Sequence, residues 1–127
     1  MQHISHQETE IMKIIWNAPD ERLTTRDVEV RLAAIDGKKR NISSLMTVIA
    51  RLVDKGFLDT VKKHRQSTYY VPLIQEQEHR AFTTKEFIDG VHEGKLSSLA
   101  STLIECGLYA QQDIEALRSI LGQNTSL

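Results

Sequence analysis

The fold is decided by residues 41–57, which read NISSLMTVIARLVDKGF. Asn41 is a favourable helix N-cap, and Gly56 is typical of a helix C-terminus. Apolar residues recur between them at steps of three and four, which predicts a helix with one buried face: Ile42, Leu45, Ile49, Leu52 and Val53. The remaining face carries mostly short side chains: Ser43, Ser44, Thr47, Ala50, Arg51 and Asp54. A face that served only solubility would hold more Glu and Lys, so this one is a candidate contact surface.

Two helices are predicted before this stretch. Ser5 with Glu8 forms a capping-box pattern, and the apolar run after it predicts a helix over about residues 6–17. Thr24 with Asp27 repeats the cap signal, and the helix that follows ends at Asp36-Gly37. The apolar spacing of this second helix is formed by Val28, Leu32 and Ile35.

A β-hairpin is predicted directly after Gly56. Residues 58–73 are rich in β-forming side chains on either side of His64-Arg65-Gln66-Ser67. The loop lacks Asn-Gly or Asp-Gly, so this prediction depends on pattern and composition. Pro72 places the second strand at an edge or at its own end. We expect a two-stranded hairpin with a basic tip.

Three further helices are predicted after the hairpin, over about residues 75–92, 96–105 and 111–121. The fold class is therefore mainly α, with a winged helix-turn-helix (three helices and a hairpin wing) over residues 1–73 and a helical region over residues 74–127. The last three helices are too short and too acidic for a strong independent domain, and they are better explained as a dimerisation surface. Its predicted residues are Phe82, Phe87, Ile88, Val91, Leu99, Leu103, Ile114, Leu117 and Leu121.

The charge of the chain is divided between these two parts. The formal net charge is −1, but residues 1–73 hold 12 Lys and Arg against 9 Asp and Glu, whereas residues 74–127 hold 4 against 8. Within the first part, residues 38–65 hold 8 basic side chains against 2 acidic ones. A polyanion is the natural partner of that segment.

The polyanion that fits is double-stranded DNA. A major groove accepts a helix whose outer face carries short polar groups, which predicts base contacts by Ser43, Ser44, Thr47 and Arg51. On this helix alone, an ordinary amphipathic helix is an equally good interpretation. Lys62, Lys63 and Arg65 on the following wing favour DNA, because they can contact flanking phosphates. Lys38, Lys39 and Arg40 either add phosphate contacts or form a charged loop.

Other function classes find little support. At 127 residues, with no apolar stretch near the ~20 residues of a membrane span, the chain suits one small cytoplasmic protein without membrane insertion. The single Cys106 cannot form an intramolecular disulfide, and the five His residues show no metal-ligand spacing. No nucleophile with a base, phosphate-binding glycine loop or carboxylate pair is evident, so we expect no enzyme activity, metal or cofactor.

The sequence resembles a known family over nearly its whole length. The stretches that carry the resemblance are Glu10–Trp16 (EIMKIIW), Thr47–Phe57 (TVIARLVDKGF), Tyr69–Leu73 (YYVPL) and Ile114–Leu117 (IEAL). They look like the penicillinase repressor and methicillin-resistance repressor family, to which copper-responsive repressors also belong. The resemblance implies a homodimer that binds a near-palindromic DNA operator and blocks transcription.

The resemblance also implies particular DNA contacts and a particular mode of regulation. Family contacts fall by position on Ser43, Ser44, Met46, Thr47 and Arg51, although relatives often carry Lys or Arg at the positions of Ser43 and Met46. The copper-sensing branch needs Cys-x-Cys pairs, which this chain lacks. The β-lactam branch is inactivated by proteolysis downstream of a membrane sensor, at a bond that corresponds to Thr102-Leu103.

Two alternatives remain open from the sequence. The recognition helix and wing could contact a protein, as a winged-helix interaction module, or the repressor could respond to a different signal. A steep dependence of DNA binding on salt would exclude the interaction module.

Overall fold

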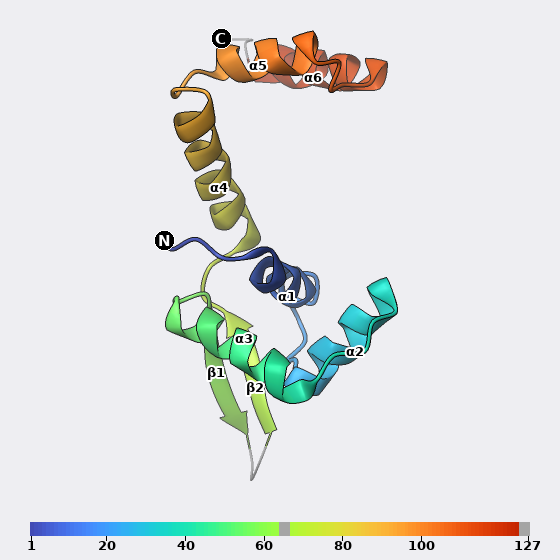
Figure 1. Ribbon diagram of the computed structural model, residues 1–127, viewed down its shortest axis with the longest axis vertical. Helices are drawn as coiled ribbons and strands as arrows, with labels where there is room; N and C mark the ends of the chain where they lie inside the picture. Colours follow the sequence, from blue (N-terminus) through green and yellow to red (C-terminus); the bar gives the residue numbers. More distant parts are fainter. Residues whose placement is uncertain (64–66, 125–127) are drawn as a thin grey trace. The chain divides into compact units, whose positions relative to one another are not determined.

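The computed structural model describes residues 1–63 and 67–124, and its elements follow the predicted order (Figure 1). The elements are α1 (His6–Trp16), α2 (Thr25–Asp36), α3 (Ile42–Asp54), β1 (Leu58–Lys63), β2 (Ser67–Pro72), α4 (Glu76–Val91), α5 (Leu96–Glu105) and α6 (Gln111–Asn124). The chain forms two compact units, Met1–Thr83 and Thr84–Leu127, whose boundary lies within α4. Each unit is described separately below.

The helix starts are set by the predicted caps. The Ser5 hydroxyl accepts a hydrogen bond from the Glu8 amide, and the Glu8 carboxylate accepts one from the Ser5 amide, which completes a capping box. Thr24 and Asp27 form the same reciprocal pair at α2. The Asn41 side chain accepts from the Ser44 amide at the start of α3.

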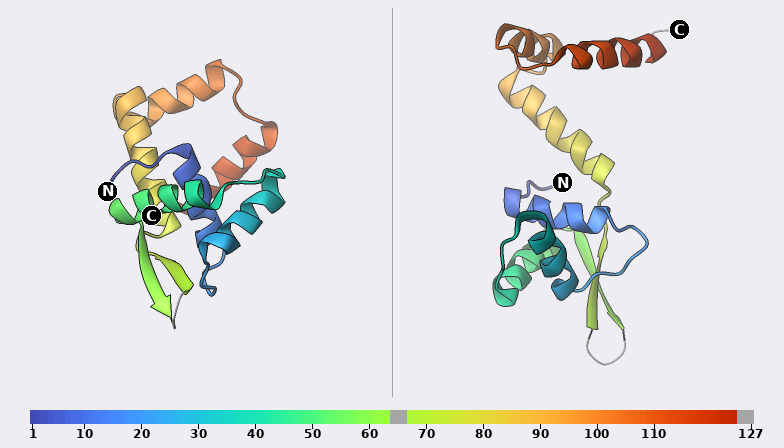
Figure 2. Two further views of the ribbon diagram at one scale, coloured as in Figure 1. Left: turned by 60° about the horizontal axis from the view of Figure 1, so that its bottom comes forward. Right: turned by 90° about the vertical axis from the view of Figure 1, so that its right-hand side faces the viewer.

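The first unit is a winged helix-turn-helix, as predicted. Helices α1, α2 and α3 pack around one core, and β1 and β2 form an antiparallel hairpin that extends beyond the helices (Figure 2). Pro72 is the last residue of β2 and lies opposite Leu58. The predicted basic tip, including Arg65, lies outside the described residues.

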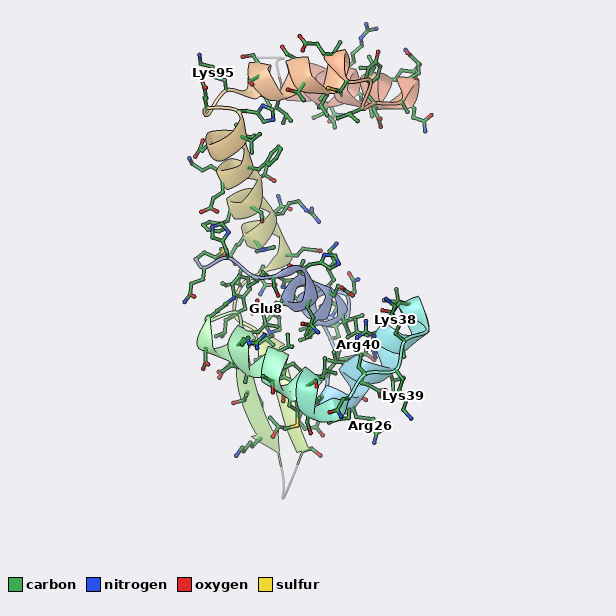
Figure 3. The ribbon with its side chains drawn as sticks, in the orientation of Figure 1. Glu8, Arg26, Lys38, Lys39, Arg40 and Lys95 are labelled. Carbon is green, nitrogen blue, oxygen red and sulfur yellow. The ribbon has the colours of Figure 1, made fainter. Side chains whose placement is uncertain are left out.

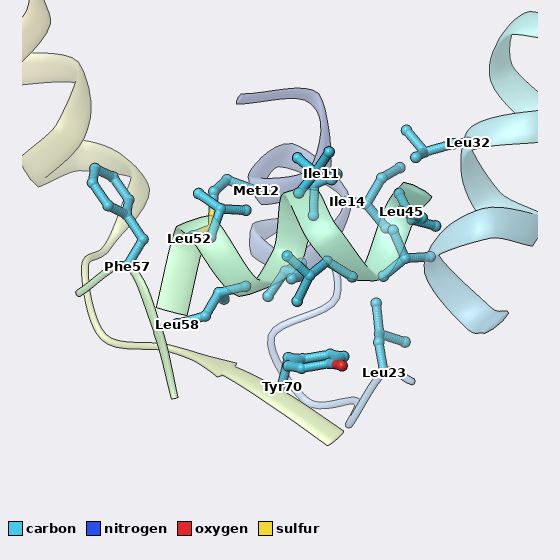
Figure 4. Close-up of a cluster of buried hydrophobic side chains, with 14 of the residues drawn as sticks. Ile11, Met12, Ile14, Leu23, Leu32, Leu45, Leu52, Phe57, Leu58 and Tyr70 are labelled. Atoms are coloured by element: carbon cyan, nitrogen blue, oxygen red, sulfur yellow. The ribbon is translucent and has the colours of Figure 1, made fainter. Parts of the chain in front are cut away.

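The core of this unit joins α3 to every neighbouring element (Figure 4). Its fully buried side chains are Phe57, Ile11, Met12, Ile49, Leu52, Leu58 and Val28. Phe57 folds back on α3, and its amide donates to the Leu52 carbonyl at 2.9 Å. Val48 is also buried, although the predicted stripe omitted it. Ile35 continues the apolar spacing of α2 but is 74% exposed, because it lies in the last turn beyond the buried Leu32.

The hairpin is attached to α2 through Tyr70. The Tyr70 amide donates to the Leu23 carbonyl at 3.0 Å, which forms an isolated antiparallel bridge. The Tyr70 hydroxyl lies 3.1 Å from Thr25 Oγ1, and its ring is buried in the core. The wing is therefore held against the start of α2 by both main-chain and side-chain contacts.

The first turns of α4 belong to the winged-helix unit. Trp16 Nε1 donates to the Ile74 carbonyl at 2.9 Å. The His79 ring lies 5.6 Å from the ring of Trp16 and 5.6 Å from that of Phe57. Burial among these rings lowers the pKa of His79, so the neutral imidazole is favoured in the folded state.

A partly buried ion pair connects α1 to the end of α3. Lys55 Nζ donates to Glu8 Oε1 at 2.9 Å and to the His3 carbonyl at 3.0 Å. The Glu8 side chain is almost completely buried. Burial raises the pKa of Glu8, but hydrogen bonds from Ser5 and Lys55 outweigh burial, and the net shift is downward. Glu8 is therefore ionised in the folded protein at neutral pH.

Glu8→Gln should destabilise the protein at neutral pH by about 2 kcal/mol, because Lys55 and the capping box lose a charged acceptor. The pKa of Glu8 is lower in the folded than in the unfolded state. The ionised carboxylate therefore adds to the free energy of unfolding at a pH above the pKa of the unfolded state, and this contribution is lost as the pH falls through the pKa of the folded state. Urea unfolding of both proteins at about pH 7 and about pH 3 measures this. The exposed Glu115→Gln is the control. An equal difference at both pH values would contradict the prediction.

Candidate nucleic-acid interface

The exposed side of α3 forms a continuous surface opposite the core. We call this surface the outer face; it consists of Ser43, Ser44, Met46, Thr47, Ala50, Arg51 and Asp54, all exposed. Leu45, Ile49 and Leu52 on the opposite side are buried. The short residues leave the backbone of α3 accessible, so another molecule can approach it closely.

The polar groups of the outer face are largely available to a ligand. The Thr47 hydroxyl donates to the Ser43 carbonyl at 3.1 Å, which leaves its oxygen free to accept. Within residues 1–63 and 67–124, the Arg51 guanidinium makes no hydrogen bond or ion pair, and its side chain is exposed. With Asp54 as the one acidic residue of the outer face, the formal charges on this face cancel.

The hairpin after α3 carries the three predicted wing cations in its sequence, Lys62, Lys63 and Arg65. Lys62 is exposed near the end of β1. Lys63 pairs with Ser67 across the hairpin, but its side chain lies outside what the structure describes. Arg65 also lies outside the described residues. Of the three predicted wing contacts, Lys62 is thus the one whose exposure is known.

The basic loop before α3 contains two exposed lysines and one arginine that is held by an ion pair. Lys38 and Lys39 are exposed, and neither ammonium group makes an ion pair among the described residues. Arg40 instead bonds both carboxylate oxygens of Asp36, and its guanidinium lies 3.8 Å from Glu10. Hydrogen bonding by Arg40 lowers the pKa of Asp36. Arg40 therefore links the end of α2 to α1, and less of its charge is available to a ligand.

Arg26 is an exposed cation that the sequence patterns did not single out. It lies in the first turn of α2, next to Thr25, whose hydroxyl contacts Tyr70. In the view of Figure 3, Arg26, Lys38 and Lys39 project from the same side of the unit, where α2 and the start of α3 lie. The cap at Thr24 predicted that Arg26 lies at a helix start, but the position of this helix start near α3 depends on the packing of α2 against α3.

The second unit carries exposed apolar side chains on short helices. A groove of about 270 Å³ between α5 and α6 is lined mainly by leucine, isoleucine and aromatic residues. Of the predicted dimerisation residues, this groove contains Leu103, Ile114 and Leu117. Leu99 and Ile88 are half-buried, Phe87, Val91 and Leu121 are exposed, and Phe82 lies in the first unit beside His3. Ile104, Leu108 and Tyr109 line the groove but were not predicted.

Residues 1–63 and 67–124 contain no group of three or more His, Cys, Asp or Glu placed to hold a metal ion. In the same ranges, no helix is both long and apolar enough to cross a membrane. Cys106 is exposed at the end of α5.

Two relatives of this chain are named as bacterial regulatory proteins. Over 120 residues, it is 32% identical to the methicillin resistance regulatory protein MecI of Staphylococcus aureus, with 94% of each chain covered. It is 26% identical over 121 residues to the penicillinase repressor of Bacillus licheniformis, with 95% of this chain and 91% of the relative covered.

A solved structure and a family model extend this comparison. H. salinarum RosR is 15% identical, with a TM-score of 0.54 over 99% of this chain and 98% of RosR, which shows a shared fold. The penicillinase repressor family model matches residues 4–123. The chain therefore belongs to the penicillinase repressor family, whose members are transcriptional repressors and not enzymes.

Proposed function

We propose that this protein is a homodimeric repressor that reads a near-palindromic DNA operator with the outer face of α3. The observation that carries this proposal is a helix face of short side chains, accessible along its length and adjacent to a wing. Ser43, Ser44, Met46, Thr47 and Arg51 are the proposed base-reading residues. Such a surface fits the major groove, where side chains must approach base edges closely.

The cations around the outer face are the proposed phosphate anchors. The outer face has no net formal charge, so most of the electrostatic attraction to DNA has to come from neighbouring elements. Lys38, Lys39, Lys62, Lys63 and Arg65 fill this role in the proposal, and the structure leads us to add Arg26. Because Arg40 is engaged with Asp36, we assign it mainly to holding the loop before α3 in place.

The second unit supplies the proposed dimer interface. Exposed apolar side chains on α5 and α6 require a partner surface, and a second copy of the same unit provides one with two-fold symmetry. Two winged-helix units related by such an axis would match a near-palindromic operator. The acidic character of residues 74–127 fits this assignment, because a pairing surface has no need to attract nucleic acid.

Regulation of the β-lactam-resistance type is also part of the proposal. Thr102 and Leu103 are both exposed on α5, and a cut between them would separate α6 from the winged-helix unit. Removal of α6 would take away much of the proposed dimer surface and thus weaken operator binding. A membrane sensor protease pathway would supply the signal to this cytoplasmic repressor, and a response to a different signal is the alternative.

Arg51→Ala should weaken binding to a duplex selected by the wild-type protein by about 1–3 kcal/mol, roughly 5- to 150-fold, and should relax preference at one position of each half-site. The reason is that Arg51 is the single cation on the outer face. Equilibrium binding to the selected duplex and to its single-base variants measures both effects. Arg80→Ala, on α4, is the matched control. If Arg51→Ala bound the selected duplex with unchanged affinity, Arg51 would not belong to the DNA interface.

The double substitution Lys62→Ala and Lys63→Ala should weaken binding to all duplexes by a similar factor. Phosphate contacts carry no sequence information, and removal of each one lowers the slope of log K against log salt by about 1. Titrations at several salt concentrations measure the slope, with Lys85→Ala on α4 as the control. A changed sequence preference with an unchanged slope would contradict the assignment. A shallow slope in the wild-type protein would favour a protein-interaction module instead.

Leu103→Glu combined with Leu117→Glu should convert the dimer to a monomer, because two charges would enter the apolar groove between α5 and α6. Light scattering coupled to size-exclusion chromatography measures the mass. Ile35→Glu is a suitable control, since Ile35 is 74% exposed on α2 in the other unit. A dimer that survives the double substitution would place the interface elsewhere.

A further inference from the structure

Two apolar residues lie together on the otherwise polar outer face. Met46 and Ala50 are four residues apart on α3, so their side chains are neighbours on one side of the helix. Met46 is 52% exposed, and Ala50 is also exposed. The pair lies beside Thr47, one of the residues assigned to base reading.

A groove separates Met46 and Ala50 from the hairpin. This groove of about 260 Å³ runs between α3 and the hairpin, with Met46 and Ala50 on one wall and Thr60 and Tyr70 on the other. Methionine has an unbranched, polarisable side chain that adapts to irregular surfaces. The groove gives the Met46 thioether room to move aside when DNA approaches, so an apolar group can be received on the outer face without a clash.

The major groove of DNA offers one prominent apolar group, the C5-methyl of thymine. Serine and threonine hydroxyls bond several bases, and Arg51 is suited to guanine, so thymine is singled out by the apolar groups of the outer face, which include the methyl group of Thr47 beside the pair. Neither Met46 nor Ala50 can donate a side-chain hydrogen bond to a base edge. Contact with a thymine methyl is the interaction by which these two residues can help the protein distinguish T·A from other base pairs.

We infer that Met46 and Ala50 form a thymine-reading patch, which selects a T·A pair in each operator half-site through the 5-methyl group. This inference rests on the proposed function, because it assigns a base to part of the same face. The thymine methyl would pack against the Met46 thioether and the Ala50 methyl, and bound DNA would shield all three groups from water. Burial of one such methyl is expected to strengthen binding about fourfold.

The first experiment identifies the selected base. Duplexes are selected from a randomised library by the full wild-type chain, by Met46→Ser and by the control Ile35→Ser. The wild type and the control should enrich a T·A pair at one position in each half-site. Met46→Ser should weaken that preference, because only Ala50 then remains in the patch, and should keep the preferences at the remaining positions, including those that depend on Arg51.

The second experiment changes the DNA alone and is therefore independent of protein folding. Deoxyuridine replaces the selected thymine, which removes only the 5-methyl group. Wild-type affinity should fall about fourfold for one half-site and about 15-fold for both. Met46→Ser should show a smaller difference between the two duplexes, because Ala50 alone of the patch then remains to contact the methyl group. Deoxyuridine at a thymine outside the half-sites is the control, and 5-methylcytosine paired with guanine should recover part of the affinity.

Each outcome bears on the inference. Equal wild-type affinity for the thymine and deoxyuridine duplexes would overturn it, as would an undiminished thymine preference in Met46→Ser. In either case a wild-type protein that still enriches a two-fold symmetric sequence would leave the proposed repressor function intact. Failure of the wild-type protein to enrich any sequence would overturn both.

Discussion

Tyr70 joins three parts of the winged-helix unit through three kinds of contact. Its amide donates to the Leu23 carbonyl, its hydroxyl meets the Thr25 hydroxyl, and its ring lies in the core against which α3 packs. The hairpin, the start of α2 and α3 are therefore all held at one residue. Because a protein that reads DNA must present its helix and its wing at a constant spacing, this residue supports every contact assigned to the interface.

The basic residues of the first unit divide between structural and exposed roles. Lys55 and Arg40 are held by Glu8 and Asp36, where they connect separate elements of the fold. Arg26, Lys39 and Lys62 remain exposed around α3. The net positive charge of residues 1–73 thus overstates the charge offered to a ligand at any one place. A partner that binds at the outer face of α3 would meet a nearly neutral helix surface with cations around it.

Local sequence patterns were sufficient to predict the elements, but not the contacts between them. Ser5, Thr24 and Asn41 begin helices through bonds to residues three positions away, so their effect is visible in the sequence. The Trp16–Ile74 and Lys55–Glu8 bonds span 58 and 47 residues, and no periodicity indicates them. The same distinction applies to the interface. Helical spacing made Ser43, Thr47 and Arg51 candidates, whereas Arg26 becomes a candidate only when α2 is seen beside the start of α3 (Figure 3).

The packing of His79 on Trp16 and Phe57 has a consequence for the modularity of the chain. Ile74 and His79 follow the hairpin in sequence, yet they cover the indole of α1 and accept its hydrogen bond through the Ile74 carbonyl. A fragment that ended at residue 73 would expose Trp16 and leave its Nε1 without this acceptor, whereas one that ended at Thr83 would retain both contacts. Recombination between family members would thus keep both contacts of Trp16 within one parental sequence only if the crossover fell after His79, well beyond the end of the hairpin.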